Sequence, residues 1–288
     1  MEDLMAKRCI WMNCGTALGL LLAAALIGGL AANPSWGKEL RQELVEQSMV
    51  EQVLRKGVLR VGMSTFVPWA MHDKQGNLIG FEIDVARRLA KDMGVKVEFV
   101  PTKWSGIIPG LLTGKFDIII GGMGILPERN KKVNFTIPYD SSGMSIVAHQ
   151  QVAAGFASLE DLNKEEVTVV ARLGTTAAEA ARKHLPKARV LLFDDESQAI
   201  QELLNGKAHA FISSRPTPAH LAARHPGKLF LPFPEPFTRE PIGFALRKGD
   251  VDSLNFLNNW ILLAEADGWL KERRDYWFGG TSWEDLLK

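Results

Sequence analysis

The stretch Phe116-Asp-Ile-Ile-Ile-Gly-Gly-Met-Gly-Ile-Leu-Pro-Glu-Arg129 predicts a buried strand that runs directly into a helix. Residues 116–120 are mostly apolar and rich in β-branched side chains, as is typical of a strand. The glycines that follow open the backbone to a ligand, because no Cβ stands in the way. Pro127 suits the first turn of a helix, where its missing N–H is not needed. Arg129 adds a guanidinium in that turn, so we expect this place to bind a small anion, most naturally a carboxylate held bidentately.

The pattern of strands and helices around this stretch occurs twice in the chain. The first set comprises a strand at 58–63, a helix at 80–93, a strand at 95–100, a helix at 104–112 and the strand at 116–120. The second set comprises a strand at 167–171, a helix at 176–184, a strand at 189–193, a helix at 197–204 and a strand at 208–213. This order of elements indicates a parallel sheet with helices on both sides. We therefore predict an α/β fold of two lobes.

The second lobe has its own turn that is suited to an anion. Its first strand runs through Arg172 and a glycine into Thr175 and Thr176. Thr176 and Glu179 are expected to form a capping box, which as local chemistry can simply start a helix. Ligands of open α/β sheets nevertheless lie beyond the carboxyl ends of the strands. Two facing lobes would therefore aim Arg129 and the Thr176 turn at one cleft.

The composition limits the functions that are open to the chain. It has 288 residues, of which 46% are hydrophobic and 23% charged, and its net charge is +1. This is ordinary for a globular chain that is long enough for two domains. The charge balance gives no case for binding nucleic acid or a membrane surface.

Residues 1–37 are predicted to be a secretory signal peptide. Lys7 and Arg8 precede a stretch without charges whose apolar centre is 17–32, and small residues follow it. Cleavage is expected after Ala32 or Gly37, which would place the mature protein in the periplasm. The alternative is an uncleaved membrane anchor, because the stretch is long enough to span a bilayer. Both cysteines lie in this segment, so we expect no disulfide and no thiolate site in the mature chain.

Other side chains that could carry chemistry have simpler explanations. The six histidines show no metal-ligand spacing, so we expect no metal or other cofactor, and His220 and His225 are expected at the surface. The carboxylates Glu82 and Asp84 form a pair at the start of a predicted helix. We expect them to interact with the positive end of the helix dipole.

Motifs along most of the chain resemble those of family 3 periplasmic solute-binding proteins, the amino-acid-binding receptors of ABC importers. The motifs are Gly57–Gly62, Gly80–Val85, Trp104–Pro109, Gly114–Ile118, Glu128–Arg129, Phe135–Tyr139, Gly174–Thr176 and Gly206–Ala208. The resemblance implies a type II periplasmic-binding-protein fold, in which two α/β lobes joined by a two-strand hinge close on a ligand. The first lobe would comprise residues 50–142 and 239–288, and the second lobe residues 143–238. We expect a monomer whose partner is an inner-membrane ABC permease.

The resemblance also implies roles for individual residues. The arginine that binds the ligand α-carboxylate in this family matches Arg129, and the threonine turn of the second lobe matches Thr176. Gly122 would offer a carbonyl, and the aromatic positions of the family's cleft match Phe66 and Trp104. The full expected ligand site is Phe66, Trp69, Trp104, Gly122, Gly124, Arg129, Arg172, Thr175, Thr176 and Ser214.

Three positions depart from the family pattern, and each departure removes a group that would accept a hydrogen bond from a ligand ammonium. Ser214 stands where the family usually has an aspartate, Gly124 where it has Ser or Thr, and Met63 where some members have an acid. A buried ammonium without a countercharge is destabilised, commonly by several kcal/mol.

These departures leave two interpretations of the ligand. Either an acid elsewhere takes the place of the aspartate, Asp140 and Glu240 being the nearest candidates, or the ligand is a carboxylate without an ammonium. Arg172 and Arg215, both expected near the cleft, favour the second interpretation and are compatible with a diacid.

The second lobe and the tail also resemble cyclohexadienyl dehydratase, an enzyme built on the same fold. The likeness lies in Lys187–Val190, Asn205–Ala208 and the spacing of Trp260, Glu265, Gly268, Arg273, Tyr276 and Trp277. Dehydration by that route needs a carboxylic acid that protonates the leaving hydroxyl. Ala177 occupies the place of that acid, and Glu179, two residues on, is expected to serve the helix cap. We therefore expect a binding protein rather than an enzyme.

Overall fold

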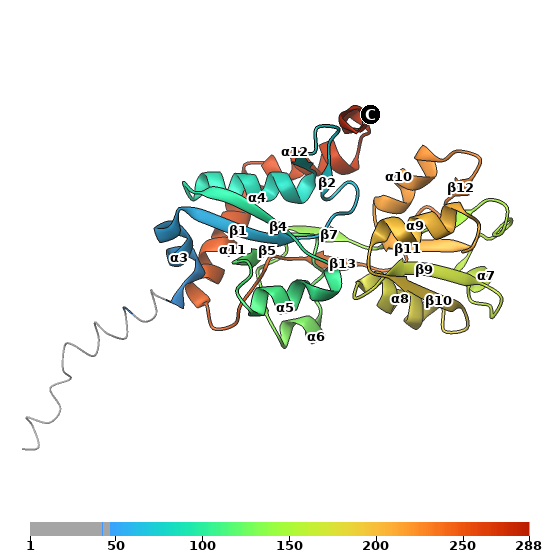
Figure 1. The fold of residues 1–288 in the computed structure, drawn as a ribbon, viewed down its shortest axis with the longest axis horizontal. Helices are drawn as coiled ribbons and strands as arrows, with labels where there is room; N and C mark the ends of the chain where they lie inside the picture. The colour runs from blue at the N-terminus through green and yellow to red at the C-terminus, as the bar shows by residue number, and fades with distance from the viewer. Residues whose placement is uncertain (1–41, 43–46, 288) are drawn as a thin grey trace, which may run out of the picture. The chain divides into compact units, whose positions relative to one another are not determined.

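The computed structural model describes residue 42 and residues 47–287, so the signal peptide predicted for residues 1–37 lies outside the described residues. Residues 48–288 form one compact unit (Figure 1). Within the described part of the chain, no helix is both long enough and apolar enough to cross a membrane.

A mixed five-stranded sheet forms the first lobe. Its strand order is β4-β1-β5-β14-β6, with β1 parallel to β4 and β5, and β14 antiparallel to β5 and β6. The strands are β1 (Val58–Met63), β4 (Lys96–Pro101), β5 (Ile118–Ile119), β6 (Asn134–Phe135) and β14 (Ala245–Leu246), with a hairpin of β2 (Met71–His72) and β3 (Leu78–Ile79). The helices are α3 (Met49–Lys56), α4 (Phe81–Asp92), η1 (Trp104–Gly106), α5 (Ile107–Leu112), α6 (Pro127–Asn130), α11 (Val251–Ala266), α12 (Trp269–Phe278) and η2 (Ser282–Leu286). Because β14 and the last helices come from the end of the chain, two separate segments build this lobe.

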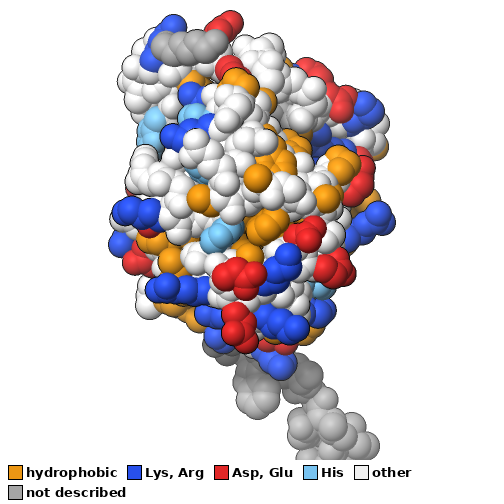
Figure 2. Space-filling view, turned by 90° about the vertical axis from the view of Figure 1, so that its right-hand side faces the viewer, with side chains coloured by type: hydrophobic (Ala, Val, Ile, Leu, Met, Phe, Trp, Pro, Cys, Tyr) orange, Lys and Arg blue, Asp and Glu red, His pale blue; other side chains and the backbone are white. Residues whose placement is uncertain are grey.

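A second five-stranded sheet, in the order β10-β9-β11-β8-β12, forms the second lobe. The strand β9 is parallel to β10 and β11, and β8 is antiparallel to β11 and β12. The strands are β8 (Met144–His149), β9 (Thr168–Arg172), β10 (Arg189–Phe193), β11 (Ala210–Ser214) and β12 (Leu229–Phe230), and the helices are α7 (Leu159–Leu162), α8 (Thr176–His184), α9 (Glu196–Leu204) and α10 (Thr217–Arg224). Figure 2 faces the end formed by this lobe and shows basic and acidic side chains interspersed rather than gathered in a patch of one sign.

Two antiparallel strands join the lobes. The strand β7 (Asp140–Ser142) leaves the first lobe and β13 (Glu240–Ile242) returns to it, with Glu240 opposite Ser142. At Gly143, just after β7, a Cβ would lie 2.1 Å from the carbonyl oxygen of Thr238, so only glycine fits where the two crossings pass each other. The predicted fold of two α/β lobes on a two-strand hinge is thereby confirmed, while the lobe boundaries given for it stay a prediction.

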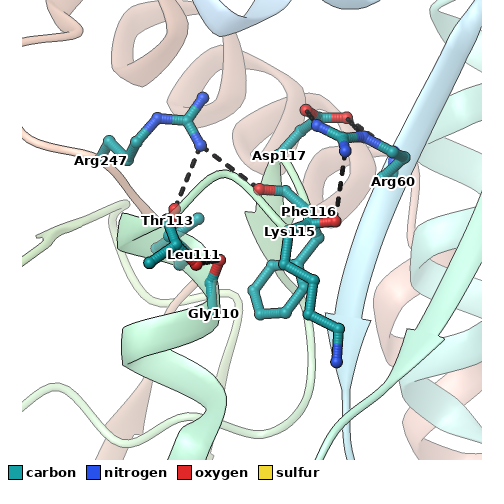
Figure 3. A network of polar contacts seen from close by, with 8 residues as sticks. All are labelled: Arg60, Gly110, Leu111, Thr113, Lys115, Phe116, Asp117 and Arg247. Carbon is teal, nitrogen blue, oxygen red and sulfur yellow. Dashed lines mark hydrogen bonds and ion pairs between the residues drawn. The ribbon is translucent and has the colours of Figure 1, made fainter.

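Hydrogen bonds at the amino end of β5 fix the strand that leads to the glycine turn (Figure 3). The buried carboxylate of Asp117 accepts a hydrogen bond from the backbone N–H of Arg60 at 2.9 Å and another from its guanidinium at 2.7 Å. Arg247 Nη1 donates to the carbonyl oxygens of Leu111 and Phe116, both at 3.3 Å. The strand is shorter than the predicted 116–120, and at its amino end the carbonyl of Phe116 accepts from the side chain of Arg247.

Candidate functional site

A small cavity lies between the two lobes. Eight of the ten residues predicted for the ligand site line it together, namely Phe66, Trp104, Gly122, Arg129, Arg172, Thr175, Thr176 and Ser214. The cavity has a volume of about 20 Å³, which is enough for about one water molecule. The lobes are therefore closed on each other, and a larger ligand can enter only if they part.

Arg129 reaches across the cleft from the first lobe to the second. Its Nη1 donates to the carbonyl oxygen of Gly124 at 3.0 Å, and its Nη2 donates to that of Gly174, in the second lobe, at 3.3 Å. Burial lowers the pKa of Arg129, while the carboxylates of Glu179 and Glu240 raise it, and the guanidinium stays charged in any case. The helix α6 that carries Arg129 has only four residues. It therefore has little of the dipole that the sequence led us to expect, and the guanidinium is the stronger anion-binding group.

Arg172 reaches across the cleft in the opposite direction. It ends β9 in the second lobe, and its Nη1 donates to Ser64 Oγ at 3.1 Å and to the carbonyl oxygen of Thr65 at 3.3 Å, both in the first lobe. Its guanidinium carbon lies 5.1 Å from the ring centroids of both Phe66 and Trp104. Burial lowers the pKa of Arg172, and two neighbouring carboxylates oppose this effect. Two buried arginines, one from each lobe, thus face the same cavity.

Thr175, rather than Thr176, caps the helix α8. Its backbone is extended, with φ −94° and ψ 161°, and its Oγ1 accepts a hydrogen bond from the N–H of Ala178 at 3.3 Å. The predicted capping box of Thr176 with Glu179 is therefore wrong by one residue, because Gly174 with φ +75° turns the chain before Thr175. The first N–H groups of a helix have no partner within it, and here they belong to residues that line the cavity.

Two residues of the predicted site do not line the cavity. Trp69 is 1% exposed and stacks behind Phe66, with ring centroids 5.6 Å apart. Its large ring fills the space beneath Gly122, where a Cβ would meet it at 3.3 Å, so Trp69 belongs to the core that supports the aromatic wall. Gly124 lies at the edge of the cavity, and its carbonyl oxygen is the acceptor for Arg129.

Glu196 lines the cavity, although we did not predict it from the sequence. It begins α9, and Ser213 Oγ donates to its Oε1 at 2.6 Å. Burial raises the pKa of Glu196, while the Arg172 guanidinium and the Ser213 hydroxyl oppose that rise. Its position beyond the carboxyl end of β10 is the signal that could have found it. An acid in the first turn of a helix is, however, common for reasons of local electrostatics alone.

Glu240 lies close to Arg129, as one of the two acids that we expected to replace the missing aspartate. Its Oε2 is so near to Gly124 that a Cβ there would lie 2.7 Å from it. Burial raises the pKa of Glu240, and the hydroxyl of Thr176 and the guanidinium of Arg129 oppose that rise. A side chain at position 124 would displace this carboxylate, so the glycine makes room for the acid.

Asp140, the other acid that we expected, lies elsewhere. It lines a separate pocket beside the hinge together with Arg215 and Arg274. Burial raises the pKa of Asp140 to about 6. The expectation that Arg215 lies near the cleft is wrong, because this arginine is exposed and borders the same hinge pocket, not the cavity between the lobes.

Glu82 contacts the residues that support the cavity, in addition to lying at the start of a helix. It is fully buried, and both of its carboxylate oxygens lie within 2.8 Å of Tyr139 Oη. Burial raises the pKa of Glu82 to about 8, although hydrogen bonds with Tyr139 and the backbone of Gly122 lower it. The carboxyl of Glu82 therefore connects Gly122, which lines the cavity, to Tyr139, which precedes the hinge strand β7.

The C-terminal tail explains two further differences from expectation. Trp277 Nε1 donates to Asp84 Oδ2 at 2.8 Å, so Asp84 fixes α12 against α4. His220 is buried, not at the surface, because η2 brings Glu284 to 3.2 Å from its Nδ1 and Trp283 against its ring. Among the described residues, no group of three or more potential metal ligands gathers at one point.

The architecture and the cavity define the class of the protein. Two α/β lobes on a two-strand hinge enclose a buried cavity whose wall carries two guanidinium groups, two aromatic rings and a helix N-terminus. This is the arrangement of a two-lobed binding protein that traps a small ligand by closure. The chain belongs to the bacterial extracellular solute-binding proteins, family 3, whose family model matches residues 59–280.

Individual relatives are similar over most of their length. The chain is 30% identical over 264 residues to the L-cystine-binding protein TcyJ of Escherichia coli K12, covering 91% of this chain and 95% of that protein. It is 30% identical over 213 residues to the cyclohexadienyl dehydratase of Pseudomonas aeruginosa, covering 74% of this chain and 79% of the enzyme. The crystal structure of AncCDT-1, an ancestral amino acid-binding protein that is a precursor of cyclohexadienyl dehydratase, matches with a TM-score of 0.73 and 44% identity, covering 80% of this chain and 99% of that one.

Proposed function

We propose that the protein is the extracytoplasmic receptor of an ABC importer and captures an amino acid or a related small carboxylate between its lobes. The observation that carries this proposal is the state of Arg129. Arg129 is 8% exposed, its guanidinium donates hydrogen bonds to two carbonyl oxygens, and among the described residues it makes no ion pair. A buried guanidinium to which no carboxylate is bonded directly is stabilised strongly by a carboxylate that binds it with two hydrogen bonds. The similarity to an L-cystine-binding protein and to an ancestral amino acid-binding protein supports the same class of ligand.

Binding begins, in this proposal, on the first lobe of an open form. The ligand carboxylate meets Arg129 and the backbone of Gly122, and its body lies against Phe66 and Trp104. Closure then brings the first N–H groups of α8, at Thr176, onto the same carboxylate and expels water. Because helix N-termini favour anions, closure is stabilised by the ligand that it encloses.

The remaining parts of the proposal concern the protein in its cell. The chain is exported by the signal peptide predicted at residues 1–37, works as a monomer and presents its closed form to an inner-membrane permease. The lobes are those predicted from the sequence, with boundaries at 142/143 and 238/239. Membership in a family of extracellular binding proteins supports export.

A dehydratase is the second candidate, because one relative is an enzyme of that kind. The position where we expect its acid is Ala177, which lines the cavity, and Glu179 is exposed. Glu196 is the carboxyl among the residues that line the cavity, but it begins α9 rather than following the Gly-Thr turn, and its Oε1 is occupied by the hydroxyl of Ser213 at 2.6 Å. We expect no aromatic product when the protein is incubated with a cyclohexadienyl acid, as followed by ultraviolet absorbance. Product formation that is lost in Glu196→Gln would support the enzyme instead.

Calorimetry of ligand binding tests the receptor proposal. The mature protein is titrated with the common α-amino acids and with matched carboxylates that lack the amine. We expect one group to bind, and Arg129→Ala to weaken that binding by about 100-fold or more, because it removes the charged partner of a buried carboxylate. Arg55→Ala, which removes an exposed arginine from α3, is the matched control. Tight binding by the Arg129→Ala protein would contradict the assignment.

A further inference from the structure

Arg172 has binding capacity that its contacts within the protein do not use. It is 6% exposed, its Nε is buried without a hydrogen-bond partner, and its contacts with Ser64 and Thr65 both come from Nη1. Among the residues that the structure describes, it makes no ion pair. A guanidinium offers five N–H donors in a planar fork. Arg172 therefore presents a buried positive charge with open donors at the wall of the cavity.

A purely structural role does not account for this arrangement. A structural buried arginine is normally paired with a carboxylate, because an unpaired buried charge is strongly destabilising. Two acids, Glu196 and Asp195, raise the pKa of Arg172, but neither forms an ion pair with it, and the buried Glu196 accepts instead from Ser213 at 2.6 Å. Arginine stays charged, and among the described residues neither Arg129 nor Arg172 makes an ion pair with a carboxylate. The two arginines of the cavity thus leave charged donors that a ligand carboxylate can bind.

The position of Arg172 relative to Arg129 fits the two ends of one small molecule. Their guanidinium carbons lie 5.1 Å and 6.0 Å from the ring centroid of Trp104. The sum of these two distances, about 11 Å, is the upper limit for the separation of the two guanidinium carbons. Arg172 also borders a wider pocket of about 510 Å³ that shares Phe66 and Glu196 with the cavity. There is room beside Arg172 for the distal part of a ligand that is anchored at Arg129.

We propose that the ligand is a dicarboxylate, with one carboxylate on Arg129 and the second on Arg172, and its carbon chain between the rings of Phe66 and Trp104. This inference rests on the proposed function, because it assumes that Arg129 binds the first carboxylate. It gives a physical reason for the serine at position 214, where the family usually has an aspartate. Ser214 lines the cavity, and an acid there would repel the second negative charge of such a ligand.

Pairs of ligands that differ only in the distal group provide the test. The mature protein is titrated calorimetrically with L-glutamate and L-glutamine, L-aspartate and L-asparagine, and glutarate and its monoamide, with adipate as a longer diacid. We expect the diacid of at least one pair to bind about 10- to 100-fold more tightly than its amide, because a hydrogen-bonded charge is replaced by a neutral group. Equal affinity, or preference for the amide in every pair that binds, overturns the inference without the use of any variant.

Variants of Arg172 then assign the effect to this residue. In Arg172→Gln we expect the preference for the diacid to fall to less than about threefold, and in Arg172→Lys to be intermediate, because lysine keeps the charge but loses the planar fork. Arg215→Gln, which changes an arginine at the hinge pocket instead, is the matched control and should keep the wild-type preference. A preference that persists in Arg172→Gln overturns the inference. If diacids and monocarboxylates bind equally and both need Arg129, only this inference fails; if no carboxylate binds, the proposed function fails with it.

Discussion

Replacing Glu82 with glutamine is expected to change how the stability of the protein depends on pH. The Glu82 carboxyl is fully buried against Tyr139, and burial raises its pKa from the ordinary 4.5 to about 8. Between these two pH values the folded protein keeps a proton on Glu82 that the unfolded chain has released. The free energy of unfolding therefore falls as the pH rises, with a slope of about 1.4 kcal/mol per pH unit from this group alone. Below pH 4.5 and above pH 8 the two states carry the same charge on Glu82, so its contribution no longer changes there.

The magnitude follows from that window. A shift from 4.5 to about 8 corresponds to a loss of roughly 5 kcal/mol of stability across the whole interval, of which about 4 kcal/mol falls between pH 5 and pH 8. Glutamine has nearly the shape of the protonated carboxyl and cannot ionise. We therefore expect Glu82→Gln to match the wild type near pH 5 and to be more stable by about 3 to 4 kcal/mol at pH 8.

Urea denaturation followed by tryptophan fluorescence at pH 5, 6, 7 and 8 measures this difference. The other ionisable groups contribute to both proteins alike, so the difference between variant and wild type isolates Glu82. Glu165→Gln, which changes an exposed carboxylate in the second lobe, is the matched control and should show no trend with pH. A difference between Glu82→Gln and the wild type that stays constant within about 1 kcal/mol from pH 5 to pH 8 would refute the assignment of a retained proton to Glu82.

Three further substitutions test how the fold positions the cavity. Asp117→Ala should lower the free energy of unfolding by about 3 kcal/mol in urea denaturation, because it leaves the buried Arg60 N–H unpaired and removes a buried charge. Its ligand affinity, measured where the variant is fully folded, should equal that of the wild type. Thr175→Ala should cost about 1 kcal/mol through loss of the cap of α8, seen as a lower Tm; an unchanged Tm would contradict the observed cap. Gly122→Ala should weaken ligand binding in calorimetry, because its Cβ would lie 2.9 Å from the ring of Phe66, whereas Gly76→Ala, with φ +84° and nothing within 4 Å of its Cβ, should bear only the backbone strain and bind normally.

Much of the fold was predictable because its signals are local. The run of β-branched residues before the glycine turn indicates β5, and the apolar periodicity of residues 81–92 indicates α4. The hinge came from the resemblance to a family, since nothing local in residues 140–142 marks them as a crossing. The exact cap of α8 was missed by one residue, because two adjacent threonines are equally good caps and the conformation of Gly174 decides between them.

The parts of the site that were missed depend on contacts between distant segments. Trp69 is an aromatic residue of the kind that lines ligand clefts, yet in the fold its ring stacks behind that of Phe66. Glu82 precedes Tyr139 by 57 positions, so no pattern in the sequence announces their hydrogen bond. Glu196 begins α9, and its partner Ser213 lies 17 positions later in β11. Each of these residues acquires its role only when the chain has brought the second segment beside it, and single-sequence patterns carry no such information.

The closed arrangement indicates what a ligand must achieve in this cleft. In the observed state the lobes are linked by hydrogen bonds from Arg129 to Gly174 and from Arg172 to Ser64 and Thr65. Bonds of this kind contribute about 0.5 to 3 kcal/mol each, so a ligand that breaks them must replace them with something stronger. A carboxylate does so, because its charge-assisted pair of bonds to a guanidinium exceeds a bond to a neutral carbonyl. At Arg172 the contacts with Ser64 and Thr65 use only Nη1 and leave the buried Nε unbonded, so a second carboxylate there would add bonds to the closed form, and a ligand with two carboxylates would stabilise closure more than a ligand with one.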